Sequence, residues 1–203
     1  MKATITATAK YLPQKTLSNQ ELEKMVDTSN EWILSRTGIE NRHIVSDGEA
    51  TSDMCSQIAN QLLEKSGKSA EDIDLILVAT STPDFLVVST AALVQDKIGA
   101  KNAWGYDIVA ACTGFVYAME TGAKFIESGS YNNVIVIGAD TMSSIIDYTD
   151  RNTCVIFGDG GGGVLLEPTQ EETGIIDSIL HIDGSGHKYL TVPAGGSANP
   201  ASK

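Results

Sequence analysis

Hydrophobic and polar positions along the chain alternate between the two-residue period of strands and the longer period of helices. Residues 74–80 and 133–139 are short, almost continuous apolar runs, as is typical of strands buried in a parallel sheet. Other strand-like stretches cover residues 3–9, 106–109, 155–157, 163–166 and 174–182. Helix-like stretches cover residues 18–26, 29–38, 52–67, 89–98 and 112–128, and Ser52 is expected to cap the third of them. This order predicts an α/β protein with parallel crossovers and helices that cover the sheet.

The composition restricts the class of protein. The 203 residues carry 14 Lys and Arg against 26 Asp and Glu, a net charge of −12, which argues against nucleic acid and anionic membranes as partners. No apolar run approaches the length of a membrane span, and the first residues lack the apolar block of a signal peptide. The cysteines, Cys55, Cys112 and Cys154, stand far apart and have no partner at metal-ligand spacing. We therefore expect a cytoplasmic globular protein without a bound metal.

Cys112 stands where an apolar strand meets a helix. The stretch DIVAACTGF, residues 107–115, passes through small residues into the helix, a context that exposes a nucleophile on a sharp turn. The first N–H groups of the helix would favour a thiolate at Cys112 and could stabilise a substrate oxyanion. The same pattern fits a small, buried and inert cysteine equally well. Cys55 and Cys154, in an apolar helix and a strand-like stretch, fit a packing role.

Residues 158–163, GDGGGG, match the dinucleotide motif GxGxxG, but a strand-like stretch follows where that site requires a helix. We therefore expect neither NAD nor ATP, and interpret the glycines as positions of tight turns or close backbone approach. The three histidines, His43, His181 and His187, have no partner at convincing spacing and are interpreted as structural or solvated.

Thr28, Trp32 and Arg36 are spaced four residues apart, which would place them on one helix face. A tryptophan beside an arginine can hold a flat ring that bears phosphates, through stacking and ion pairing. Taken alone, the pattern favours a tryptophan packed on the core and a solvated arginine. Arg151 lies in a polar stretch and has no distinguishing feature of its own.

Four stretches together carry a family resemblance: DTSNEWILSRTGIENRH from residue 27, DIVAACTGF from residue 107, DYTDRNTCVIFGDGGGG from residue 147, and VPAGGS near the end. They resemble β-ketoacyl-acyl-carrier-protein synthase III, the condensing enzyme that starts type II fatty acid synthesis. The resemblance covers essentially the whole chain in register. It favours the nucleophile over the buried, inert interpretation of Cys112.

The resemblance implies the N-terminal half of a thiolase-like layered α/β fold. Its mixed sheet would carry a buried helix after the nucleophile turn, and family members form homodimers. We expect residues 1–170 to form the half that carries the nucleophile, and residues 171–203 to begin the connection to a C-terminal half outside this sequence. In the family that second half contributes a histidine and an asparagine for decarboxylation, and no motif for either occurs here.

The resemblance also implies roles for individual residues. Cys112 would take an acyl group from acetyl-CoA or another acyl-CoA and then condense it with malonyl-acyl-carrier protein, without a permanently bound cofactor. The nucleotide of CoA would be held by four side chains, namely Trp32 and Arg151 around the adenine, with Arg36 and Thr28 nearby. Walls of the acyl pocket correspond to Met142, Phe157 and Val87, the last capping the pocket of the partner subunit. A valine where the family often has a bulky aromatic makes longer or branched primers conceivable.

Three alternatives remain open on the sequence. One is a related condensing enzyme of secondary metabolism, of the polyketide or quinolone type. Another is a CoA-binding half-chain without turnover. A third, 3-hydroxy-3-methylglutaryl-CoA synthase, resembles the chain less, because its acid/base glutamate follows the central strand where this sequence has Thr80, Ser81 and Thr82. Type III polyketide synthases and thiolases differ in the residues around Cys112.

Overall fold

A computed structural model describes residues 1–201 of the chain. Its centre is a five-stranded mixed sheet, in which three strands run parallel and two pair antiparallel along one side. In spatial order the strands are β1 (Lys2–Tyr11), β7 (Asp159–Thr169), β6 (Val134–Thr141), β4 (Leu75–Ala79) and β5 (Trp104–Ile108). The expected parallel crossovers are therefore present among β4, β5 and β6, while β7 and β1 complete the sheet in the antiparallel sense.

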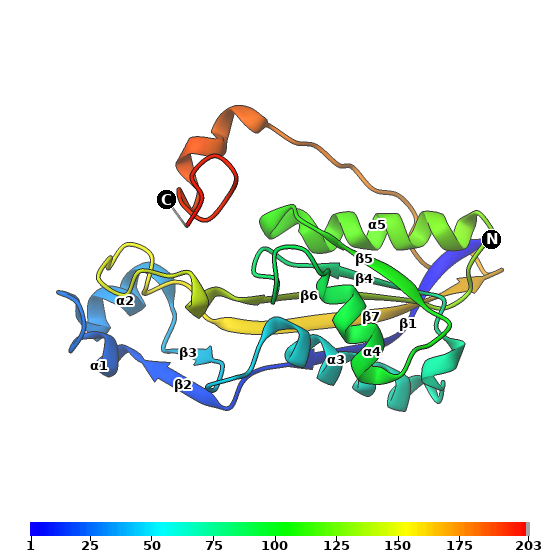
Figure 1. Cartoon of the computed structure of the whole chain (residues 1–203), viewed down its shortest axis with the longest axis horizontal. Helices are drawn as coiled ribbons and strands as arrows, with labels where there is room; N and C mark the ends of the chain where they lie inside the picture. Colours follow the sequence, from blue (N-terminus) through cyan, green and yellow to red (C-terminus); the bar gives the residue numbers. More distant parts are fainter. Residues whose placement is uncertain (202–203) are drawn as a thin grey trace.

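Helices cover both faces of this sheet (Figure 1). The helices α3 (Thr51–Ser66) and α4 (Thr90–Ile98) lie on one face, and α5 (Gly114–Glu127) lies on the other. Side chains of β4 alternate between the two cores: Ile76 packs towards α3 and α4, whereas Leu77 packs towards α5. The inner face of α5 is buried, and its outer face is open, with Val116 half-exposed. The two apolar layers hold the parallel strands β4, β5 and β6 so that their carboxyl ends meet at one edge.

A small unit extends the molecule beyond this edge (Figure 1). It consists of the antiparallel pair β2 (Lys15–Ser18) and β3 (Asn41–Ile44) and of the two helices between them in the chain, α1 (Asn19–Leu22) and α2 (Asn30–Thr37). The Ser29 hydroxyl caps α2 by accepting a hydrogen bond from the Trp32 amide at 3.1 Å. Gly38 ends the helix with φ of 70°, a left-handed conformation that glycine adopts without a steric penalty.

Most of the expected elements are present, with two kinds of error. Ser52 is not the cap of α3: the helix begins at Thr51 after Ala50, and the Ser52 hydroxyl donates to Asp84 at 2.6 Å. Residues 155–157 form no strand, since Val155 and Ile156 lie in a turn and Phe157 follows it, and residues 174–182 contain no strand. Residues 174–182 are joined to β1 by one backbone hydrogen bond, which the Ile175 amide donates to the Ala3 carbonyl oxygen at 2.9 Å.

The glycines of β7 allow close packing within the sheet. A Cβ added at Gly163 would lie 2.8 Å from Ile58 Cγ2 of α3 and 2.9 Å from the Val136 carbonyl oxygen. The expected close approach is therefore confirmed, while the expected tight turns are absent, because the segment is an extended strand. No helix follows the GxGxxG motif, as its apolar continuation predicted.

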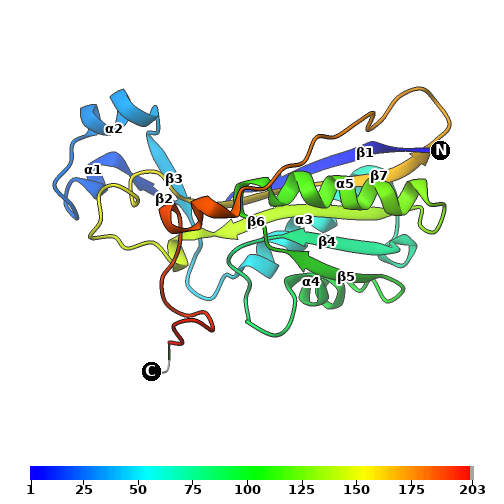
Figure 2. The same ribbon diagram turned by 90° about the horizontal axis from the view of Figure 1, so that it is seen from above.

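After β7 the chain runs beside α5 and then over the end of the sheet (Figures 1 and 2). The Tyr117 hydroxyl donates to the His181 carbonyl oxygen at 2.6 Å, which fixes one point of this path. Short 3₁₀ turns complete the inventory: Ala70–Asp72, Ala111–Thr113, Met142–Ser144 and Gly184–Tyr189. Within residues 1–201, each helix is too short or too polar to cross a bilayer.

Candidate active site

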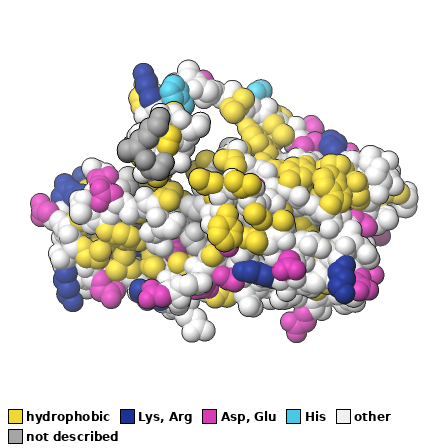
Figure 3. Space-filling view, in the orientation of Figure 1, with side chains coloured by type: hydrophobic (Ala, Val, Ile, Leu, Met, Phe, Trp, Pro, Cys, Tyr) yellow, Lys and Arg dark blue, Asp and Glu magenta, His cyan; other side chains and the backbone are white. Residues whose placement is uncertain are grey.

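The carboxyl ends of β4, β5 and β6 border a cavity of about 1040 Å³. Ligands of open α/β sheets bind at this kind of edge, because the crossover loops leave a crevice there. Cys112, Phe115, Met142 and Phe157 line the cavity, and residues 190–193 of the C-terminal segment close part of its mouth. Figure 3 shows the hollow between that segment and the body of the molecule. The lining is mainly apolar, which suits an acyl chain more than a charged group.

Cys112 lies on a strained turn between β5 and α5. The turn begins at Ala111, whose φ of 45° is left-handed and disfavoured for a residue with a Cβ. The Thr113 amide donates to the Ala110 carbonyl oxygen at 3.2 Å, and α5 begins at the next residue. Gly114 packs against Ala79 of β4, since an added Cβ would lie 3.2 Å from the Ala79 Cβ. The geometry is that of a nucleophile turn, with the thiol at the helix N-terminus.

Burial separates Cys112 from the other two cysteines. Cys112 is exposed, whereas Cys55 and Cys154 are fully buried, as their expected packing role requires. Burial raises the pKa of both buried thiols above the ordinary value, so neither is a ready nucleophile near neutral pH. Cys112 is therefore the one cysteine of the chain that a substrate in the cavity can reach.

No hydrogen bond joins a histidine to Cys112 in the described part of the chain. The ring Nδ1 of His43 lies 2.6 Å from the Pro13 carbonyl oxygen, and that of His187 lies 3.2 Å from the Gly184 carbonyl oxygen. His181 contributes its carbonyl oxygen to Tyr117. None of these contacts joins a base to the thiol, in agreement with the structural or solvated interpretation of the three residues.

Two of the three expected acyl-pocket residues line the cavity, and the third does not. Met142 and Phe157 line the same cavity as Cys112. Val87 does not: it is 95% exposed on the loop between β4 and α4, next to Leu86 at 90%. A role for Val87 therefore requires that another surface meet this loop.

Asp140 is a cavity residue that sequence reasoning missed. Its Oδ1 atom accepts three hydrogen bonds, from the Ser81 amide at 2.7 Å and from the hydroxyls of Thr82 and Thr80 at 3.0 and 3.1 Å. This carboxylate therefore holds the turn after β4 against the end of β6, beside Cys112 in the cavity wall. A signal was available, since Asp140 is the first charged residue after the apolar run 133–139.

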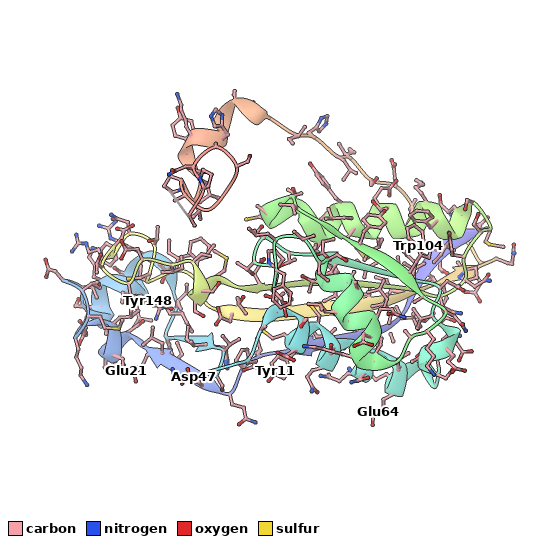
Figure 4. The ribbon with its side chains drawn as sticks, in the orientation of Figure 1. Tyr11, Glu21, Asp47, Glu64, Trp104 and Tyr148 are labelled. Atoms are coloured by element: carbon pink, nitrogen blue, oxygen red, sulfur yellow. The ribbon has the colours of Figure 1, made fainter. Side chains whose placement is uncertain are left out.

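Two arginines meet at the ring of Trp32. The guanidinium carbon of Arg36 lies 4.9 Å from the ring centroid, and that of Arg151 lies 5.0 Å away. The Arg151 Nη1 also donates to the Asp27 carbonyl oxygen at 2.7 Å. The tryptophan is half-buried. Together with Tyr148, which Figure 4 labels, it packs against a small core formed by Leu22, Ile33, Cys154 and Val155. Arg36 therefore stacks on the tryptophan, which the pattern taken alone did not favour.

Thr28 occupies a different place from the one its spacing predicted. It precedes the cap Ser29 and lies outside α2, so only Trp32 and Arg36 share the helix face. The hydroxyl of Thr28 is buried and has no hydrogen-bond partner among the described residues. A buried hydroxyl of this kind is available to a ligand that reaches the start of α2.

Comparisons with known proteins agree with this architecture. The family model described as 3-oxoacyl-[acyl-carrier-protein] synthase III matches residues 106–184. A β-ketoacyl-[acyl-carrier-protein] synthase III of Chlorobium phaeovibrioides is 59% identical over 99% of this chain and 62% of its own length. The solved 3-oxoacyl-(acyl carrier protein) synthase III of Pseudomonas aeruginosa superposes with a TM-score of 0.91 at 36% identity, covering 98% of this chain and 62% of that one. The priming β-ketosynthase of the R1128 polyketide pathway superposes with a TM-score of 0.81 at 32% identity, and the match covers 83% of this chain and 51% of that one.

The fold, with the cysteine turn at the end of its parallel strands, is an α/β scaffold of the thiolase-like class. Within that class, the chain is similar over almost its whole length to β-ketoacyl-acyl-carrier-protein synthases III. It spans about 62% of the length of the curated relatives that it matches.

Proposed function

We propose that this protein is a β-ketoacyl-acyl-carrier-protein synthase III. The Cys112 sulfur attacks the thioester carbonyl of acetyl-CoA or another acyl-CoA, and CoA leaves as its thiolate. Malonyl-acyl-carrier protein then loses CO₂, and the electron pair of the broken bond remains on its α-carbon. That carbon attacks the acyl-Cys112 thioester, the Cys112 thiolate leaves, and the product is 3-oxoacyl-acyl-carrier protein.

The observation that carries this proposal is the placement of Cys112. An exposed thiol on a strained turn, at a helix N-terminus and in an apolar cavity, suits acyl transfer through a covalent thioester. The reaction needs no permanently bound cofactor, since the thiol and the two substrates supply every bond that changes. Among the described residues no cluster of potential metal ligands occurs.

We propose that Trp32, Arg36, Arg151 and Thr28 bind the nucleotide end of CoA. Guanidinium groups at the indole ring supply stacking surfaces for adenine and positive charge for phosphates. A ring inserted between Trp32 and Arg151 needs about 7 Å, two layers of van der Waals contact. Since the observed separation is 5.0 Å, Arg151 must withdraw by about 2 Å to admit it.

Decarboxylation requires groups that stabilise the developing enolate, and none of the three histidines is hydrogen-bonded to Cys112 in residues 1–201. We propose that residues 1–170 form the half that carries the nucleophile and residues 171–203 begin the connection to a second half. That half would supply the histidine and asparagine of the family. Met142 and Phe157 would then form acyl-pocket walls within one subunit.

We further propose a homodimer formed along β5, with Val87 reaching the acyl pocket of the partner subunit. In this structure β5 is an edge strand, and exposed apolar side chains surround it (Figure 3). They are Leu86, Val87, Trp104 and Val109. An exposed edge strand with apolar neighbours favours pairing with another chain. Three free cysteines and the acidic composition are consistent with a cytoplasmic enzyme that does not bind nucleic acid or membranes.

The substitution Leu86→Asp is expected to convert the dimer to a monomer, because it places a charge in the proposed interface. Leu86 is 90% exposed, so the change should alter the stability of the subunit little. Sedimentation velocity measures the result. Leu12→Asp, beyond the β1 edge on the opposite side of the sheet, is the matched control and should leave the dimer intact. A dimer that survives Leu86→Asp would contradict an interface at this loop.

Intact-protein mass spectrometry after incubation with acetyl-CoA tests the proposed acyl transfer. The expected result is one acetyl adduct per chain, released by hydroxylamine and mapped to Cys112. No adduct would contradict catalysis and leave a CoA-binding chain without turnover. Isobutyryl-CoA and hexanoyl-CoA, offered in competition, test the longer or branched primers that a small Val87 would admit.

A related role in secondary metabolism is supported by the similarity to the polyketide priming ketosynthase. Both candidate functions use the same cysteine and differ in the acyl group and the carrier protein. A marked preference for hexanoyl-CoA over acetyl-CoA, together with no transfer to the carrier protein of fatty acid synthesis, would favour it.

A further inference from the structure

Arg42 is a buried cation that the proposed chemistry does not use. It lies on β3 and is 3% exposed, and no carboxylate of residues 1–201 forms an ion pair with it. Its guanidinium donates instead to uncharged oxygens. Nε donates to the Val155 carbonyl oxygen at 2.9 Å, Nη2 donates to the same oxygen, and Nη1 donates to Asn19 Oδ1 at 2.6 Å. Because burying an unpaired charge is costly, this arrangement points to a specific task.

On one side the hydrogen bonds continue to the helix that carries Trp32. Asn19 is fully buried, and its Nδ2 donates to Asn30 Oδ1 at 3.0 Å and to the Ile39 carbonyl oxygen at 2.9 Å. Asn30 is the first residue of α2, and Ile39 follows its last turn. Arg42, through Asn19, is therefore joined to both ends of this helix.

On the other side the hydrogen bonds end on the turn that carries Arg151. Val155 is buried four residues after Arg151, and the turn between them is closed by the Cys154 amide, which donates to the Asp150 carbonyl oxygen at 3.1 Å. The side chain of Asp150 also accepts hydrogen bonds from Asn152 and Thr153. The base of this turn is thus held by Arg42, whereas Arg151 itself is exposed at its tip.

We propose that Arg42 is a positioning residue for the nucleotide clamp, the pair Trp32 and Arg151 proposed to hold the adenine of CoA. Arg42 fixes α2 against the 150–157 turn and so sets the separation of these two side chains. This inference rests on the proposed function, in which that clamp holds the nucleotide of CoA. A guanidinium suits the task because its planar fork can donate to two segments at once, which a lysine ammonium at the same place cannot match in geometry. Because the base of the turn is fixed, the tip that carries Arg151 can withdraw to admit a ring while Arg151 stays opposite Trp32.

The test compares two acyl donors that share the thioester arm. Acetyl-CoA carries the nucleotide, whereas acetyl-pantetheine lacks it. Arg42→Lys is expected to slow acylation of Cys112 by acetyl-CoA at low concentration by about tenfold, through a raised KM, and to change the rate with acetyl-pantetheine less than about twofold. Quenching of Trp32 fluorescence by CoA, measured in a Trp104→Phe background, should weaken by the same factor.

Asn30→Ala provides a second variant that spares the buried charge. It breaks the bond from Asn19 to the first residue of α2, while the bonds of Arg42 to Val155 and of Asn19 to the Ile39 carbonyl oxygen stay in place. It should therefore show the same selective loss of acylation by acetyl-CoA, but a smaller one. Gln95→Ala is the matched control, because it removes a half-buried hydrogen bond to the Ala100 carbonyl oxygen at the far end of α4. It should affect both donors equally. Equal losses with both donors in Arg42→Lys and Asn30→Ala would overturn the inference and leave Arg42 a purely structural residue.

Trp32→Ala separates failure of this inference from failure of the proposed function. If Trp32→Ala slows acylation by acetyl-CoA more than by acetyl-pantetheine and the Arg42 and Asn30 variants do not, the clamp is supported and the positioning role of Arg42 is contradicted. If the Trp32 variant does not discriminate either, the clamp itself is wrong and the positioning role falls with it.

Discussion

Replacement of Cys112 by alanine is expected to abolish acylation by acetyl-CoA, with a loss of at least about a thousandfold. The thiol supplies the bond that holds the acyl group, so no neighbouring side chain can substitute for it. The loss should appear as the absence of the acetyl adduct in intact mass, while CoA still quenches the fluorescence of Trp32. The variant should keep its fold, because Cys112 is exposed and its φ is not positive, so alanine fits its backbone conformation as well as cysteine does.

The two buried cysteines provide the control for this experiment. Cys55→Ala and Cys154→Ala should keep the adduct, since burial raises the pKa of both thiols and keeps them protonated near neutral pH. Iodoacetamide applied to the folded protein should label Cys112 first, and prior acetylation should protect it. An adduct that persists in Cys112→Ala would show that another residue accepts the acyl group and would contradict the proposed site.

The substitution Gly161→Ala is expected to destabilise the fold by about 2–3 kcal/mol. Gly161 lies in β7 between β1 and β6, and an added Cβ would lie 2.7 Å from the Ala139 Cβ and 2.9 Å from Ile58 Cδ1. Contacts this short cannot be relieved by a flexible side-chain end, since a third neighbour, the Gly138 carbonyl oxygen at 3.0 Å, belongs to the sheet backbone. The sheet must therefore separate from α3 or distort. Urea unfolding, followed by circular dichroism, measures the change.

Gly162→Ala is the matched control in the same strand. An added Cβ there would have as its nearest neighbour the Ala9 carbonyl oxygen at 3.6 Å, an ordinary contact. Both glycines have strand geometry, so the two substitutions change the unfolded chain in the same way and differ only in packing. The free energy of unfolding of Gly162→Ala should therefore exceed that of Gly161→Ala by about 2 kcal/mol or more. Equal values would contradict the close packing of α3 on β7.

The errors of the sequence prediction have local causes. Residues 155–157 have the apolar, β-branched composition of a strand, yet Cys154 and Val155 pack on the small core of α1 and α2. The amide of Cys154 is satisfied within the turn, so no strand partner is required. Ser52 has the composition of a cap, but its hydroxyl bonds Asp84 across the fold. A local sequence pattern indicates which secondary structures a segment is able to form, and tertiary contacts decide which of them it adopts.

The sequence by itself determined the α/β architecture, the strand–turn–helix placement of Cys112 and the placement of Trp32 and Arg36 on one helix face. These depend on hydrophobic periodicity and on neighbours within a few residues, which the chain order contains directly. The meeting of Arg151 with Trp32 was implied by the family resemblance, whereas only the tertiary structure decided that Asp140 holds the turn after β4 and that Arg42 is buried between Asn19 and Val155. The partners in these contacts are brought together from distant parts of the chain. Their side chains meet because the sheet and its end unit bury apolar surface, a global result that no local pattern encodes.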